Sequence, residues 1–138
     1  MADRTLVIIK PDAVERGLTG EILTRFERKG LRVIALELRR LDDDTLSRHY
    51  EEHVSKGFYA DLVAFMSRSP AVVAVLEGPQ DTWKVVRTLM GPTNPREAPP
   101  GTIRGDLGTD LTENLVHGSD GPESAAREVV VFFPDLEH

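Results

Sequence analysis

The chain lacks cysteine altogether, and it has no apolar run long enough to cross a membrane. The missing thiols exclude disulfide frameworks, cysteine nucleophiles and cysteine-ligated zinc or iron centres. The apolar start, TLVII, is ended by Lys10 and Pro11, which makes it too short for a secretory signal. We therefore expect no membrane partner and a cytoplasmic location.

Positive charge is also scarce, since 17 Lys and Arg face 23 Asp and Glu and the net charge is -6 at pH 7. This balance argues against nucleic acid as the main partner, because nucleic-acid backbones are bound by basic faces. The sequence contains neither a GxxxxGK[ST] nor a GxGxxG segment, which excludes two common backbone cradles for phosphate. A small polyphosphate would have to be held by a few converging side chains.

What is present is an ordinary globular composition, with 40% hydrophobic and 29% charged residues. A length of 138 residues predicts one domain, residues 1–138, although Leu136 to His138 resemble an expression tag. Hydrophobic periodicity predicts strands at 5–9, 31–41, 71–76 and 129–133, and helices at 19–30, 44–50 (capped by Asp44), 59–66, 80–90 and from Pro122. The order βαββαβ predicts an α/β ferredoxin-like sandwich, with helices packed on an antiparallel four-stranded sheet.

Residues 91–111 form a long insertion that holds four of the nine prolines and four of the eleven glycines. We expect no regular element here. Because Ile103, Leu107 and Leu111 offer apolar anchors, we interpret the insertion as an ordered functional loop instead of a disordered one.

The segment NLVHGSD, residues 114–120, is the strongest local signal for chemistry. A histidine is a competent nucleophile near neutral pH, and a neighbouring carboxylate can fix its tautomer. His117 is therefore a candidate acceptor of a phosphoryl group, and the alternative is a packed or capping histidine without chemistry. Lys10, Arg87 and Arg104 lie at expected element ends or in loops, where they could hold phosphate oxygens or remain solvated surface charges.

A competing motif is HYEEH, residues 49–53, which matches the H-x-x-E-H pattern of some zinc proteases. On a helix, His49 and His53 would share a face. No third ligand is evident, so we interpret both as surface histidines and keep a zinc hydrolase as a minor alternative.

Four segments, TLVIIKPDAVERGLTGEILTRFERKG, HYEEH, PPGTIRGD and NLVHGSD, occur in the order seen in the nucleoside diphosphate kinase family, and the chain resembles that family over nearly its whole length. The resemblance implies a ferredoxin-like fold with an inserted loop. It also implies ping-pong transfer of the γ-phosphate from a nucleoside triphosphate such as ATP to a nucleoside diphosphate such as GDP, through a phosphohistidine, with broad base and sugar specificity. The alternative is a non-catalytic nucleotide-binding regulatory module of the same fold.

The resemblance also assigns roles to individual residues. It implies His117 as the nucleophile, oriented by Glu128 and Ser119, with Tyr50 beside it. The implied nucleotide contacts are Arg87, Thr93 and Arg104 for phosphate, Lys10 and Asn114 for the ribose 3′-hydroxyl and a nearby phosphate oxygen, and Phe58, Leu62 and Leu111 for the base.

The cofactor implied by the resemblance is Mg²⁺, held by nucleotide phosphates and water and by no protein side chain. The implied assembly is a homo-oligomer, a hexamer before a tetramer. Two features depart from the family pattern, namely Gly121 where serine is common and a C-terminus that lacks a longer tail.

Overall fold

The computed structural model describes residues 3–50 and 55–136. Its centre is a four-stranded antiparallel sheet in the order β2-β3-β1-β4. The strands are β1 (Asp3–Ile9), β2 (Arg32–Arg39), β3 (Ala71–Gly78) and β4 (Val116–Gly118). The prediction of a ferredoxin-like α/β sandwich is confirmed.

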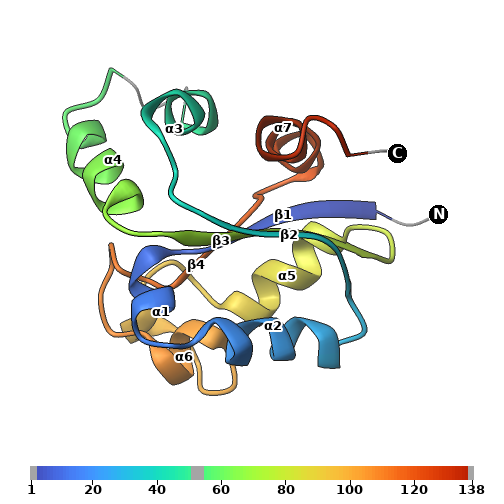
Figure 1. Cartoon of the computed structure of the whole chain (residues 1–138). Coiled ribbons are helices and arrows are strands. Elements are labelled where there is room, and N and C mark those ends of the chain that lie inside the picture. The colour runs from blue at the N-terminus through green and yellow to red at the C-terminus, as the bar shows by residue number, and fades with distance from the viewer. Residues whose placement is uncertain (1–2, 51–54, 137–138) are drawn as a thin grey trace.

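Helices cover both faces of the sheet (Figure 1). One layer holds α3 (Asp43–His49), α4 (Tyr59–Ser67) and α7 (Pro122–Phe132). The other holds α1 (Pro11–Glu15), α2 (Thr19–Arg28), α5 (Thr82–Met90) and α6 (Ile103–Leu107).

The central strand β1 shows why helices pack on both faces of the sheet. Val7 and Ile9 belong to one buried hydrophobic cluster, while Leu6 and Ile8 belong to the other. Since successive side chains of a strand point to opposite faces, an unbroken apolar run needs packing on both sides.

Helix α3 is capped by Asp42, whose Oδ1 accepts a hydrogen bond from the backbone N–H of Thr45 at 2.7 Å, so the prediction of Asp44 as the cap is wrong.

The predicted last strand, residues 129–133, is wrong, because helix α7 continues through it. The run VVVFF has high strand propensity, yet Ala125, Glu128, Val129 and Phe132 are buried at helical spacing and pack this face on the sheet. The fourth strand is instead the short β4, which pairs with β1 so that Ile8 lies opposite His117.

The prediction that residues 91–111 contain no regular element is also wrong. A short 3₁₀ helix, η1 (Pro95–Glu97), begins after Asn94, and the side chain of Thr102 caps α6. Ile103 is fully buried and anchors the insertion, as predicted, whereas Leu111 is 59% exposed and is not an anchor.

Strand β2 lies at one edge of the sheet and is shorter than the predicted strand 31–41. Two of its apolar side chains, Leu36 and Leu38, are 54% and 63% exposed and do not belong to the buried core. Within the described ranges, no helix is long and apolar enough to span a bilayer.

Candidate active site

A cavity of about 360 Å³ opens between β4 and the helices α3, α5 and α7. It is lined by His49, Tyr50, Arg87, His117, Gly118, Asp120, Ser124, Arg127 and Glu128. Two of the three β4 residues are therefore in its wall. The central residue of this strand presents one imidazole to a space bordered by arginine side chains.

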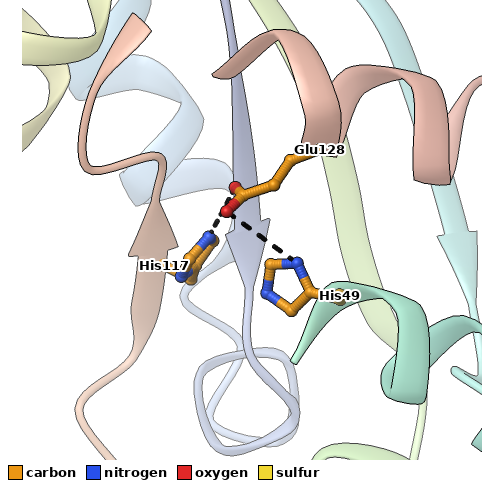
Figure 2. Close-up of side chains that lie close together, drawn as sticks. All are labelled: His49, His117 and Glu128. Atoms are coloured by element: carbon orange, nitrogen blue, oxygen red, sulfur yellow. Dashed lines mark hydrogen bonds and ion pairs between the residues drawn. The ribbon is translucent and has the colours of Figure 1, made fainter. Parts of the chain in front are cut away.

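The best-defined contact in the cavity joins His117 to Glu128. The Nε2 atom of His117 lies 2.9 Å from Oε1 of Glu128, a side chain that reaches down from α7 (Figure 2). The hydroxyl of Ser119 donates to the same oxygen at 2.9 Å. Because an ionised carboxylate only accepts hydrogen bonds, this contact places the ring proton on Nε2 and leaves a lone pair on Nδ1.

Glu128 is buried, yet its environment favours the ionised form. Burial alone would raise the pKa of this carboxyl, but the hydrogen bond from His117, the neighbouring imidazoles of His117 and His49 and the hydrogen bond from Ser119 hold the pKa below its usual range. The carboxylate therefore stays negative beside an imidazole that is 23% exposed to the cavity.

His49 lies beside the pair and is 4% exposed, so the interpretation of this residue as a surface histidine is wrong. Its ring meets that of His117 edge to face, with centroids 4.7 Å apart, and meets Tyr50 and Phe132 in the same manner. Burial and the neighbouring His117 lower the pKa of His49 to about 3. Its partner in the HYEEH motif, His53, lies outside the described residues.

A second polar cluster lies where β1 ends. The Lys10 ammonium donates to Oδ1 of Asn114 at 2.7 Å, while the Asn114 amide donates to the carbonyls of Thr93 and Leu111, each at 3.0 Å. Burial and Arg104 lower the pKa of Lys10 to about 8. Asp12, which sequence reasoning did not single out, fixes the same loop by accepting from the backbone N–H of Leu115 at 3.1 Å.

Arg104 ties the inserted segment to the strand that carries His117. Its guanidinium donates to the carbonyls of Asn114, Gly91 and Val116 at 3.1, 3.0 and 2.6 Å. Since a guanidinium has five N–H donors, two of them form no hydrogen bond to the described residues. Burial and the charge of Arg87 lower the pKa of Arg104 to about 10. Arg87 itself donates to the carbonyl of Gly118 at 3.2 Å and lines the cavity.

The structure brings some of the predicted residues together and leaves others apart. His117, Glu128, Ser119, Tyr50 and Arg87 gather at the cavity, and Lys10, Asn114 and the Thr93 backbone form the second cluster. The three apolar candidates for contact with a base do not line this cavity. Phe58 precedes α4 and is 51% exposed, Leu62 packs against the core, and Leu111 is exposed.

Sequence reasoning missed Arg127, because a single arginine on a helix carries no signal by itself. It donates to the carbonyls of Arg48 and His49 and so ties α7 to the end of α3. Sequence reasoning also missed His49 as a member of the site, although His49 directly precedes Tyr50, which the resemblance places beside the nucleophile. Within the described part of the chain, His49, His117 and Glu128 offer donor atoms that all lie within 4.8 Å of one another.

Comparison with known proteins agrees with this geometry. The family model described as nucleoside diphosphate kinase matches residues 3–138. A nucleoside diphosphate kinase of Streptomyces avermitilis is 57% identical over 135 residues, which cover 97% of this chain and 98% of the relative.

Solved structures are similar over nearly the whole chain. A halophilic nucleoside diphosphate kinase from Halobacterium salinarum, determined in complex with CDP, superposes with a TM-score of 0.92 at 47% identity, covering 98% of this chain and 90% of that one. The Aquifex aeolicus nucleoside diphosphate kinase gives a TM-score of 0.93 at 44% identity, with 99% of each chain covered. The chain therefore belongs to the nucleoside diphosphate kinase family, whose members are phosphotransferases that act on nucleotides.

Proposed function

We propose that this phosphotransferase works in two half-reactions, in which Nδ1 of His117 takes the γ-phosphate from a nucleoside triphosphate and passes it to a nucleoside diphosphate. The observation that carries the proposal is the 2.9 Å contact between His117 Nε2 and Glu128 Oε1. It supports a neutral ring whose Nδ1 lone pair is free to attack phosphorus. As the N–P bond forms and the bond to the leaving oxygen breaks, the ring becomes cationic, and the adjacent carboxylate stabilises that charge.

The nucleotide contacts implied by the family resemblance are proposed on the geometry around this centre. Arg87 at the cavity and the two spare donors of Arg104 suit phosphate oxygens. The Lys10–Asn114 pair supplies a donor and an acceptor for a ribose hydroxyl. Thr93 contributes a side chain for phosphate, Tyr50 lies beside the nucleophile, and Phe58, Leu62 and Leu111 offer apolar surface to a base without reading its identity.

Mg²⁺ is proposed to arrive with the nucleotide as part of the substrate. The cavity is lined by two carboxylates, Asp120 and Glu128, and Oε1 of Glu128 is already occupied by His117 and Ser119. This is too few oxygens for a cage made of protein, and it fits a cation held mainly by phosphates and water. Since nucleoside triphosphates are the substrates, we also propose a cytoplasmic location.

One experiment tests the intermediate. After incubation with γ-labelled ATP alone, the label is expected on the protein, stable in alkali and lost in acid, and addition of GDP is expected to produce labelled GTP. His117→Gln is expected to lose both labelling and exchange while it still binds nucleotide. An acid-stable label on Ser119, or exchange by the variant at the wild-type rate, would refute the phosphohistidine.

A further inference from the structure

His49 presents an unexplained feature of the cavity wall. Neither ring nitrogen of this buried side chain has a hydrogen-bond partner among the described residues. A buried polar group without a partner costs free energy, and such groups in folded proteins are usually paired or bind a water or an ion. His49 lines the same cavity as His117 and Glu128, and one of its ring nitrogens lies within 4.8 Å of donor atoms of both.

The three side chains together offer a known set of metal ligands. Nδ1 of His49 lies 4.0 Å from Oε2 of Glu128, and Nε2 of His117 lies 2.9 Å from Oε1 (Figure 2). Two histidines and one glutamate, with a water in the fourth position, form one of the usual sets for zinc. In a tetrahedral zinc site the ligand atoms lie about 3.3 to 3.5 Å apart. The donor atoms of the three side chains lie within 4.8 Å of one another, so a bound metal has to draw the longest separation together by up to about 1.5 Å.

The charges around the cluster decide which cation it prefers. Arg127 Nη2 lies 3.8 Å from Oε2 of Glu128, and Arg87 lines the same cavity. These positive charges repel any cation. Only a metal ion that forms strong bonds to nitrogen can overcome that repulsion. Imidazole nitrogen suits Zn²⁺ and Co²⁺, whereas Mg²⁺ prefers oxygen.

We propose that His49, His117 and Glu128 bind Zn²⁺, and that the bound ion inhibits phosphoryl transfer by changing the tautomer of His117. This inference rests on the proposed phosphorylation of Nδ1. A neutral imidazole carries one proton, and a metal bond to Nε2 uses the lone pair of that nitrogen. The proton therefore moves to Nδ1, which then has no lone pair to attack phosphorus. Glu128 exchanges its hydrogen bond with the ring for a bond to the metal through Oε2, while Oε1 keeps Ser119.

Binding is tested on the full chain without nucleotide. Titration with Co²⁺ is expected to give the visible absorption of a four-coordinate site, which Zn²⁺ then removes. In ¹⁵N spectra of the wild type, Zn²⁺ is expected to move the His117 proton from Nε2 to Nδ1, a readout that needs no variant. Absence of the cobalt spectrum, or an unchanged tautomer at saturating zinc, would overturn the proposal.

Inhibition is tested with His49→Phe, which keeps a flat ring against His117 but removes both nitrogens. Each protein is assayed with Mg–ATP and GDP and compared with its own rate in zinc-free buffer. Loss of one ligand is expected to weaken zinc inhibition by at least about tenfold. Equal zinc sensitivity in both proteins would overturn the proposal. Failure of the phosphohistidine mechanism is distinguishable, because it would appear as missing label on His117 without any zinc.

Discussion

At the scale of single residues, Glu128 has the most demanding role, since one buried carboxylate orients the ring, accepts from Ser119 and faces the charge that develops on His117. Glu128→Gln keeps the shape but removes the negative charge. We expect kcat to fall about 100-fold or more while nucleotide affinity changes little. Rapid-quench measurement of His117 labelling checks this. Glu123→Gln, on the exposed first turn of the same helix, is the matched control and should retain full activity.

The Lys10–Asn114 pair makes a prediction about the sugar. The two side chains are joined at 2.7 Å, and in the proposed function both bind the 3′-hydroxyl of the ribose. A nucleotide that lacks the 3′-hydroxyl leaves them without that partner, at a cost of about 1 to 3 kcal/mol. We expect such nucleotides to react at least about tenfold more slowly, and those lacking only the 2′-hydroxyl to react normally. Equal kcat/KM for the three sugars would contradict the assignment.

Lys10 also predicts how nucleotide binding depends on pH. Its pKa of about 8 in the folded chain lies below the ordinary 10.5, chiefly because of burial. The folded chain therefore loses this positive charge as pH rises through about 8, whereas the unfolded chain keeps it until about 10.5. Because the unfolded state then binds more protons, the free energy of unfolding gains from this group between those two values.

The consequence for activity has the opposite sign, since the neutral amine attracts phosphate less. KM for ADP is expected to rise about tenfold between pH 7 and pH 9.5. Lys10→Arg keeps its charge over that range and should show a flat KM, even if its kcat is lower. A wild-type KM that is flat over the same range would show that Lys10 does not contact the nucleotide in its charged form.

At the scale of elements, the sequence predicts β1, β3 and α2 better than it predicts residues 129–133 near the C-terminus. Strands β1 and β3 are recognisable as apolar runs bounded by Pro11 and Pro70, and α2 by its spacing and the Gly30 stop. The strand predicted at residues 129–133 is wrong, because the strand propensity of their β-branched residues is overridden by burial of Ala125, Val129 and Phe132 at helical spacing.

The candidate site, too, is predicted only in part from the sequence. The motif around His117 predicts a nucleophile, and resemblance supplies Glu128, which lies 2.9 Å away in space and 11 positions away in sequence. No local sequence pattern reveals that Arg104 donates three hydrogen bonds to backbone carbonyls, or that His49 is buried against His117. These facts depend on how α6 and α3 pack, which is a property of the tertiary structure.

Two glycines, one in the inserted segment and one in α2, give a stability prediction. A Cβ on Gly105, in α6, would lie against the carbonyl oxygen of Pro99, well inside van der Waals contact, and Thr102 would block it as well. Gly105→Ala is expected to destabilise the chain by about 1 to 3 kcal/mol. Gly20 lies in α2 with open space around it, so Gly20→Ala should stabilise by about 0.5 to 1 kcal/mol. Denaturant unfolding measures both, and equal effects would contradict the packing around Pro99.

At the scale of the whole molecule, one feature is unusual for a protein that stays monomeric. The edge strand β2 pairs only with β3 among the described strands, and it exposes Leu36 and Leu38 on one side. Exposed apolar edge strands invite pairing with another chain. We propose that this edge lies between subunits of a homo-oligomer, for which the family resemblance implies six copies before four.

The proposed interface is tested by charge. Because Leu36 and Leu38 lie two residues apart on one strand, replacing both by Asp puts two negative charges on the same surface of each copy, where a symmetric contact brings like charges together. The double variant is expected to elute at a smaller size with a lower Tm, since subunit association stabilises the folded chain. Val130→Asp, which places a charge at a 53% exposed position on α7, is the matched control and should keep the wild-type size. Wild-type protein that scatters light as a monomer at micromolar concentration, or a Leu36/Leu38 variant of unchanged size, would show that the subunits do not meet at β2.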